Sequence, residues 1–361
     1  MSPTTPQPAA GKTPPPAAVK YAMLALFPFL MVVLMVGIML TGMHKPTPRD
    51  MPVAVVAATA QLAGQTAQGL EDALGDSFDL RPLTSEDEAR ALLHDREIAG
   101  AYVLPAAPGE DATLLTAGGA GMSQQQVVSR TFGQIAAQQG VTLDSQDLAP
   151  LHEDDSMGTV SLYLTIGFTL SGLILVVILS TAAPELMRTR KLLPVIAGWA
   201  VFMALSVWLV AGPILGAVHG HALPVLGLGA ATVATVALLT ALFARFLGPL
   251  AVIPVVTLTM FLGVPASGGG ISVWMAPSFF HTLHGVLPLP ATLESVRAVL
   301  YFGGDGVGPH LLTLGVWAAA ALLLGTAAER LTGRRGSGTP AAAAPAGPPR
   351  QERQAVVPGP A

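Results

Sequence analysis

The sequence predicts a polytopic α-helical membrane protein with six transmembrane helices and a small α/β extracytoplasmic domain between the first and second spans. Two observations lead to this fold class. The 361 residues are 52% hydrophobic and only 11% charged, with a mean hydropathy of +0.59, whereas a soluble domain carries about 25% charged residues. In addition, apolar segments of about 20 residues recur, which is long enough to cross a hydrocarbon layer of about 30 Å.

Six segments have the length and composition of membrane-spanning helices. They are Tyr21–Met43, Val160–Ala183, Leu192–Val218, Leu223–Ala244, Phe246–Ala266 and Leu311–Ala328. None contains Asp, Glu, Lys or Arg, as is typical of helices that face hydrocarbon. The first apolar run is longer than that of a signal peptide, and no small-residue cleavage site follows Met43. We therefore expect residues 20–43 to form an uncleaved transmembrane helix and residues 160–330 to form a five-helix domain.

Both ends of the chain have the composition of disordered segments. Residues 1–19 are rich in Pro, and most of residues 331–361 are Pro, Ala or Gly. Such segments cannot bury a core, so disordered cytoplasmic tails are expected. The tripeptide Gly-Lys-Thr at 11–13 resembles the end of a phosphate-binding loop. However, Pro6 stands where that motif needs glycine, and prolines at 14–16 prevent the helix that must follow.

Cationic residues gather on one side of the predicted spans. That side holds Lys12, Lys20, Arg188, Arg190, Lys191, Arg245, Arg330, Arg334 and Arg335. The short loops of the opposite side hold only Arg297. Because Lys and Arg near span ends stay in the cytoplasm, both termini are expected there, in a bacterial plasma membrane. Residues 44–159 then lie outside, and their 17 acidic and 6 basic side chains agree with this.

The outer segment 44–159 alternates strand and helix patterns. Strands are predicted at Val53–Ala57 and Ala99–Leu104, with a short extended segment at Phe78–Leu80. Helices are predicted over Ala60–Leu74, from Ser85 to about His94 and from Ser123 to about Gln139. The last two begin with the Ser-x-x-Glu or Ser-x-x-Gln spacing of a capping box. Strands that alternate with helices predict a largely parallel sheet.

Residues that carry catalysis in enzymes are not grouped in this sequence. The chain has no cysteine, no H-E-x-x-H and no G-x-S-x-G motif. No enzyme activity, cofactor or nucleic-acid partner is expected. His281 and His284 have a spacing that suits a metal, yet no carboxylate or third histidine is near in sequence, which favours interfacial or packing roles. The string His152–Asp155 suits a divalent cation, but a solvated juxtamembrane face is the favoured interpretation.

The spans lack the charges that ion-coupled carriers keep inside the membrane as relays or counter-ions. Paired half-helices, another mark of many secondary carriers, are absent as well. If the protein moves a solute, the energy is expected to come from a separate ATPase at the cytoplasmic face, because this sequence contains no nucleotide-binding motif.

Residues 266–310 should lie outside, yet they are too apolar for an ordinary loop. Ser267–Gly270 leads into Ile271–Leu287, which is too short and too interrupted to cross the membrane. Ala291–Phe302 is predicted to be an amphipathic helix, with Glu294 and Arg297 three apart on its polar side. We expect short re-entrant or interfacial helices within 271–302. The alternative is an interfacial loop helix without a transport role.

Five short stretches carry a resemblance to a known family. They are Pro52–Val56, Ser85–Arg90, Glu97–Pro105, Pro265–Gly269 and Leu287–Arg297. Together with the order of anchor, outer domain and five spans, they resemble the membrane component (permease) of type 2 ABC exporters. The similarity is greatest to the long-ectodomain branch that includes phage-infection-protein-like proteins, and it covers about residues 20–330.

The resemblance implies a permease that pairs with itself or with a similar permease in membrane lipid. It also implies a separate ABC ATPase and a hydrophobic or amphipathic exported substrate. Such permeases usually have an amphipathic helix before the first span, which the Pro-rich residues 1–19 cannot form. The short cytoplasmic loop then leaves one coupling element for the ATPase: Glu185, Arg188, Arg190 and Lys191. Ordinary positive-inside charge would explain that cluster equally well.

The outer gate is assigned to residues before the last span. They are Ser267, Gly268, Gly269, Gly270, Glu294 and Arg297. The alternative function, of a different class, is a stand-alone membrane scaffold or receptor-like surface protein. In that case the outer α/β domain would bind an envelope or extracellular partner.

Overall fold

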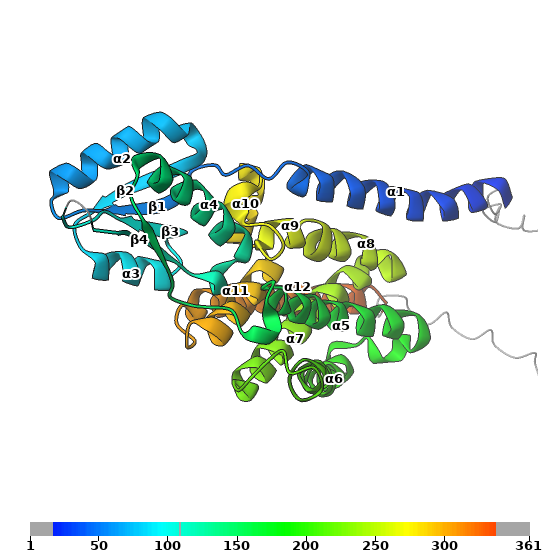
Figure 1. Ribbon diagram of the computed structural model, residues 1–361. Helices are drawn as coiled ribbons and strands as arrows, with labels where there is room; N and C mark the ends of the chain where they lie inside the picture. The colour runs from blue at the N-terminus through cyan, green and yellow to red at the C-terminus, as the bar shows by residue number, and fades with distance from the viewer. Residues whose placement is uncertain (1–16, 108–109, 337–361) are drawn as a thin grey trace, which may run out of the picture.

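A five-stranded sheet domain sits on one end of a group of long helices in the computed structural model of the chain (Figure 1). The structure describes residues 17–107 and 110–336. Helix extends into both predicted tails, because the first helix begins at Ala17 and the last helix continues to Gly336. The remaining tail residues, including the Gly-Lys-Thr tripeptide, lie outside the described residues.

The sheet domain follows the predicted alternation of strands and helices. Its strands are β1 (Met51–Val56), β2 (Phe78–Leu83), β3 (Gly100–Val103), β4 (Ala112–Thr116) and β5 (Leu143–Asp147). Its helices are α2 (Ala60–Leu74), α3 (Glu86–His94) and α4 (Met122–Gln139). The strand order is β2-β1-β3-β4-β5, and only β3 and β4 pair antiparallel. The prediction of a largely parallel sheet is confirmed.

Strand β1 is buried on both faces, which explains its continuous apolar sequence. Val53 and Val55 pack in one core with Phe132 of α4. Ala54 and Val56 point to the opposite face, where a second core contains α3 residues and Phe302, which follows the membrane-side helix α11. The second core therefore joins the sheet domain to the rest of the chain.

One of the two predicted helix caps is correct. Ser85 Oγ accepts the backbone N–H of Glu88 at 3.3 Å and opens α3. Ser123 does not cap α4, which begins at Met122 after Gly121. Gly121 has φ +152°, a conformation that side chains rarely adopt, so the chain turns sharply there. Ser123 Oγ instead accepts the N–H of Ser272 at 2.8 Å, a residue of the segment between α9 and α10.

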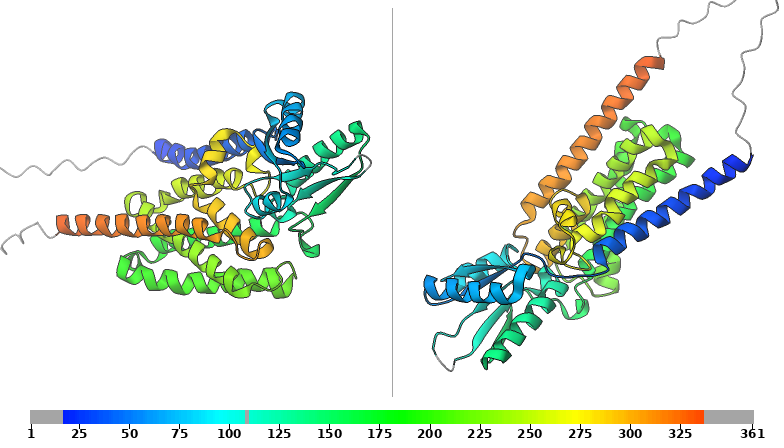
Figure 2. Two further views of the ribbon diagram at one scale, coloured as in Figure 1. Left: turned by 90° about the vertical axis from the view of Figure 1, so that its left-hand side faces the viewer. Right: turned by 90° about the horizontal axis from the view of Figure 1, so that it is seen from above.

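The remaining helices form the membrane part of the chain, which makes it a mostly helical, polytopic membrane protein. They are α1 (Ala17–Met43), α5 (Val160–Ala182), α6 (Thr189–Leu209), α7 (Ala222–Leu247), α8 (Val252–Val256), α9 (Gly263–Ser267), α10 (Ser278–His284), α11 (Pro288–Tyr301) and α12 (Val307–Gly336). Four described helical runs are long and apolar enough to cross a membrane: Val160–Ala182, Thr189–Ile214, Ala222–Leu247 and Val307–Leu331. In Figure 2, α1 and α12 lie on opposite sides of the other helices.

Two predicted span boundaries are wrong. Phe246 belongs to α7 and not to the next span, because α7 continues to Leu247 and ends at Gly248 with φ +56°. The run Val252–Ser267 is helical but irregular, since α8 and α9 are joined by a π-helical turn at Thr257–Phe261. Similarly, α6 ends in a π-helical turn at Val210–Ile214, so helix stops four residues before Val218.

Helices α5 and α7 pack with almost no space between their backbones. A Cβ on Gly172 of α5 would lie 2.4 Å from the carbonyl oxygen of Val233. A Cβ on Gly229 of α7 would lie 2.6 Å from the ring of Phe168. Because glycine alone permits this approach, these two positions hold the centre of the bundle together.

Candidate functional site

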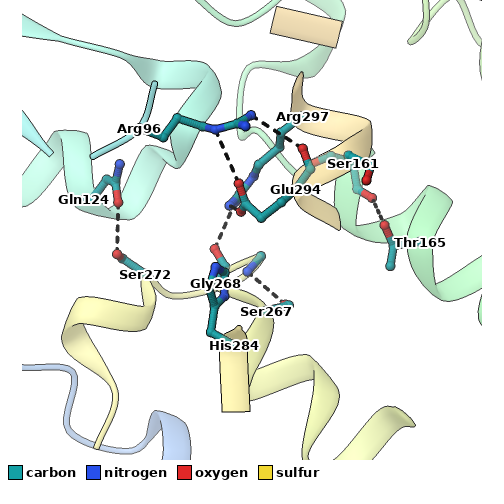
Figure 3. Close-up of polar contacts among 12 residues, drawn as sticks. Arg96, Gln124, Ser161, Thr165, Ser267, Gly268, Ser272, His284, Glu294 and Arg297 are labelled. Carbon is teal, nitrogen blue, oxygen red and sulfur yellow. Dashed lines mark hydrogen bonds and ion pairs between the residues drawn. The ribbon is translucent and has the colours of Figure 1, made fainter. Parts of the chain in front are cut away.

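Helix α11 lies where the sheet domain meets the bundle, and it is almost completely buried. The sequence predicts an amphipathic helix here, with Glu294 and Arg297 on a polar side. In the structure both faces are covered, and the exposed fractions of Glu294 and Arg297 are only 8% and 4%. The polar side is therefore an internal contact, and its partners define the candidate site (Figure 3).

The predicted gate residues come together through one arginine. Arg297 Nη1 lies 2.9 Å from Glu294 Oε1, and Arg297 Nη2 donates to the carbonyl oxygen of Gly268 at 2.9 Å. Gly268 ends α9 with φ +71°, which aims this carbonyl toward α11. Ser267 Oγ accepts the N–H of Gly269 at 3.1 Å and stabilises the same turn. A charge-assisted hydrogen bond thus joins α11 to the end of α9.

The glycines of this turn lie close to two long helices. A Cβ on Gly269 would lie 2.7 Å from Leu162 near the start of α5. A Cβ on Gly270 would lie 3.2 Å from the methyl group of Met43 at the end of α1. The turn therefore lies between the end of α1, which leads into the sheet domain, and the start of α5, which follows it.

The sheet domain contributes Arg96, a residue that the sequence analysis missed. Arg96 stands in the turn after α3 with φ +62°, and its guanidinium lies over the Phe302 ring at 5.0 Å. Its Nε is 3.7 Å from Glu294 Oε2. A single arginine in a predicted turn has no periodicity or spacing, so no sequence pattern could have linked it to Glu294.

Electrostatics support an ionised Glu294 between the two arginines. Burial alone would raise the pKa of Glu294, but Arg297, then His284 and Arg96, outweigh this effect and hold its pKa below the ordinary value. Burial lowers the pKa of Arg96, and the charge of Glu294 opposes that change. Two arginines share one carboxylate, so the cluster keeps a net positive charge in a buried place.

A cavity of about 200 Å³ lies between the sheet domain and the bundle beside this cluster. Polar side chains from both parts line it, among them Arg96, Gln124, Ser272, His281, His284, Glu294 and Arg297. Gln124 of α4 and Ser272 share a hydrogen bond of 3.0 Å across it. His281 packs on the ring of Trp274, and His284 Nδ1 lies 2.8 Å from the carbonyl oxygen of Ala266. The histidines therefore support the walls of this cavity.

A second polar link joins α11 to the start of α5. Tyr301 Oη donates to Asp155 Oδ2 at 2.5 Å. The other oxygen of Asp155 accepts the N–H groups of Thr159 and Val160 at 2.9 and 3.2 Å, so Asp155 satisfies backbone donors at the start of α5. Burial, then the bond to Asp155, raise the pKa of Tyr301. The sequence predicts a solvated face at 152–155, and for Asp155, which is 4% exposed, this is wrong.

The predicted coupling residues lie at the opposite end of the bundle. Glu185, Arg188, Arg190 and Lys191 are all exposed, and none forms an ion pair with another described residue. Arg188 also lines a cavity of about 640 Å³ at this end. The predicted coupling residues and the predicted gate residues are therefore far apart in the structure.

Two further charged residues at this end were not predicted as a pair. Arg245 at the end of α7 lies 3.4 Å from Glu329 of α12 and donates to Thr189 Oγ1 at 2.8 Å. Arg245 also bonds the carbonyl of Gly325, and Glu329 accepts from Thr189. Three helices, α6, α7 and α12, are thus joined beside the predicted coupling residues.

Comparison with known proteins supports the predicted resemblance at the level of the family. Residues 21–327 match the family described as ABC-2 family transporter protein. No curated protein and no solved structure matches the chain. The matched residues include most of α1, the whole sheet domain, the cluster around Arg297, the residue Arg245 and most of α12. The chain therefore belongs to the ABC-2 transporter family.

Proposed function

We propose that the protein is the membrane-spanning permease subunit of an ABC exporter. In this proposal it moves a hydrophobic or amphipathic substrate with energy from a separate ATPase. The single observation that carries the proposal is the family match over residues 21–327, which spans the sheet domain and the bundle together. The inserted sheet domain supports the finer assignment to the long-ectodomain, phage-infection-protein-like branch.

We further propose six membrane crossings with both termini in the cytoplasm of a bacterium. The crossings are α1, α5, α6, α7, the irregular α8–α9 run and α12. Two facts support this arrangement. Consecutive crossings run alternately toward and away from the sheet domain (Figures 1 and 2), and Arg188, Arg190, Lys191 and Arg245 all lie at the far end, as cytoplasmic residues do. The sheet domain then lies outside.

The cluster around Arg297 is the proposed outer gate. It joins α11, the glycine turn at 267–270 and the sheet domain, so a movement of one part changes the contacts of the others. The irregular α8–α9 run leads directly into this turn, and π-helical turns mark places where a helix can rearrange. Opening would require Arg297 to release the carbonyl of Gly268 while it keeps Glu294.

The loop with Glu185, Arg188, Arg190 and Lys191 is the proposed docking element for the ATPase. The six apolar segments predicted from the sequence contain no Asp, Glu, Lys or Arg, so these segments offer an ion gradient no charged relay. The exposed basic cluster and the adjacent cavity would receive a complementary acidic surface. The network of Arg245, Glu329 and Thr189 would transmit force from this loop to three helices.

A second permease copy, or a similar permease, is the proposed partner within the membrane. Helices α6 and α12 bury little of their surface inside the chain. Large apolar side chains such as Val201, Phe202, Leu312 and Leu323 are more than half exposed there. Lipid and a partner helix would share these faces.

The test is co-purification followed by ATP hydrolysis in reconstituted vesicles. We expect an ABC ATPase to co-purify from the source membrane and its turnover to rise when the permease is present. The triple variant Arg188→Glu, Arg190→Glu, Lys191→Glu should lose both effects. The matched control is Arg130→Glu, which changes an exposed arginine of α4 on the opposite side. Stable purification without an ATPase would instead favour the scaffold or receptor-like function.

A further inference from the structure

Three metal-ligating side chains meet at the outer end of α5, away from the proposed gate. They are His152 and Asp154, which precede α5, and His219 of the loop between α6 and α7. One ligand atom of each lies within 4.8 Å of the others. The His152 and His219 rings stack with centroids 4.0 Å apart, and His152 Nδ1 is 3.6 Å from Asp154 Oδ2. Among the described residues, no other group of three such side chains is this close.

The donor set identifies a class of ion. Two imidazole nitrogens and one carboxylate oxygen suit Zn²⁺ and neighbouring transition metals, whereas Ca²⁺ and Mg²⁺ prefer oxygen ligands throughout. Ligand atoms around Zn²⁺ lie about 2.0–2.2 Å from the ion, so the group must contract. All three side chains are exposed, so the stacked rings can turn toward a shared ion without disturbing the core.

Two separate segments supply the ligands, and both are well anchored. Asp155, directly after Asp154, accepts backbone N–H groups at the start of α5 and binds Tyr301. His219 lies two residues before His221, which is the N-cap residue of α7 and has φ +49°. The backbone of Gly216, in the same loop as His219, also faces Asp154, because a Cβ there would lie 3.9 Å from its carboxylate. An ion held here would therefore connect the outer ends of α5 and α7.

We propose that His152, Asp154 and His219 bind one Zn²⁺-class transition-metal ion that clamps the start of α5 to the loop between α6 and α7. The remaining coordination positions face solvent and are filled by water. The clamp ties together the outer ends of the two helices that pack most closely in the bundle. The site is independent of the transport proposal, since it contains none of the gate or coupling residues.

The test uses the purified full chain in detergent, with any polyhistidine tag removed and metal stripped by chelator. Co²⁺ is added first, because histidine-bound Co²⁺ absorbs visible light, and Zn²⁺ is then used to displace it. We expect a single saturable Co²⁺ site per chain that Zn²⁺ empties and that a large excess of Ca²⁺ or Mg²⁺ does not. Zn²⁺ should also raise the thermal unfolding temperature.

Variants assign the ligands. His152→Ala and His219→Ala should remove the Co²⁺ spectrum and the thermal shift, and Asp154→Asn should weaken both. Glu153→Gln and His44→Ala are matched controls, because they alter exposed groups nearby in sequence or on the same side and should bind like the unchanged chain. All variants should melt at the same temperature in chelator. Unaltered binding by His219→Ala, equal loss in Glu153→Gln, or no saturable uptake would overturn the proposal.

Discussion

At the scale of single residues, the protein concentrates its unusual chemistry in one buried ion pair. Glu294 and Arg297 are three residues apart on α11, and the sequence correctly suggested that they belong together. It could not show that they are buried, because an isolated Glu–Arg pair at this spacing is common on exposed helix faces. Burial depends on Arg96 and Gly268, which are distant in sequence and contact the pair only in the folded chain.

Removal of the Arg297 side chain should destabilise the protein strongly. Arg297→Ala removes the closest charged partner of the buried Glu294 carboxylate and leaves the more distant Arg96 and His284, and breaking a buried pair costs about 3–5 kcal/mol. Arg297→Lys keeps the charge but has a single terminal nitrogen, which cannot contact both Glu294 and the carbonyl of Gly268 in the same way. A smaller loss of stability is therefore expected. Thermal unfolding in detergent measures both effects.

The control for this series is Arg130→Ala, since Arg130 is exposed on α4. A surface change of this kind should stay within about 0.5 kcal/mol of the unchanged protein. If Arg297→Ala unfolded at the same temperature as Arg130→Ala, the buried pair would not stabilise the junction.

At the scale of helices and strands, strong apolar patterns predicted elements well and irregular ones poorly. The apolar run of β1 and the Ser85 cap were correct, because both depend on neighbours in sequence. Strands β4 and β5 were both missed. The sequence of β5, Leu-Asp-Ser-Gln-Asp, gives a polar edge strand that is held only by pairing with β4. The boundary between α7 and α8 was misplaced because an apolar sequence continues through the turn at Gly248.

The contact between α5 and α7 should be very sensitive to side-chain size. Gly172→Val places methyl groups where the backbone of Val233 and Ala237 already stands, at 2.4 and 3.0 Å from the Cβ position. The helices must move apart, and overpacking of this kind costs about 1–3 kcal/mol. A lower unfolding temperature in detergent is the expected result.

Gly198 of α6 provides the matched control, because a Cβ there meets nothing within 4 Å. Gly198→Val should unfold close to the unchanged protein, since valine fits into open space on a helix. Equal destabilisation by the two changes would mean that the loss comes from helix propensity and not from the α5–α7 contact.

At the scale of the whole molecule, the sheet domain is not an independent appendage. Its second core contains Phe302, its Arg96 reaches Glu294, and α4 bonds Ser272 through Ser123 and Gln124. The sequence predicted both parts and their order, but nothing in it indicated this shared interface. Contacts between distant segments have no local signature, so the placement of the domain on α11 had to come from the structure.

A disulfide should form across this interface when two cysteines are introduced. Ser123 Oγ and Ser272 N are 2.8 Å apart, and the chain has no cysteine of its own, so Ser123→Cys with Ser272→Cys creates the only two thiols. We expect rapid oxidation to an intrachain bond, measured by loss of maleimide labelling. Ser123→Cys with Thr84→Cys, an exposed residue on the loop before α3, should stay labelled. Persistent labelling of the first pair would show that the interface opens in the membrane.

The proposed topology gives a labelling pattern in intact cells. Asp87→Cys in α3 should react with a membrane-impermeant maleimide, because the proposed topology puts the sheet domain outside. Arg190→Cys should react only after the membrane is broken, since Arg190 lies at the opposite end. Both residues are exposed, so accessibility depends on the membrane alone. Labelling of Arg190→Cys in sealed cells would reject the orientation.

The glycine turn at 267–270 bears on how the sheet domain could be deleted from the chain. Gly270 touches the end of α1 and Gly269 touches the start of α5, so the polypeptide leaves the bundle and returns to it on two sides of the same small turn. A flexible linker from 43 to 160 would therefore have to pass only around this turn if the sheet domain were deleted. Excision would also remove Arg96 and Asp155, so Glu294 would keep Arg297 as its arginine partner and Tyr301 would lose the carboxylate to which it donates.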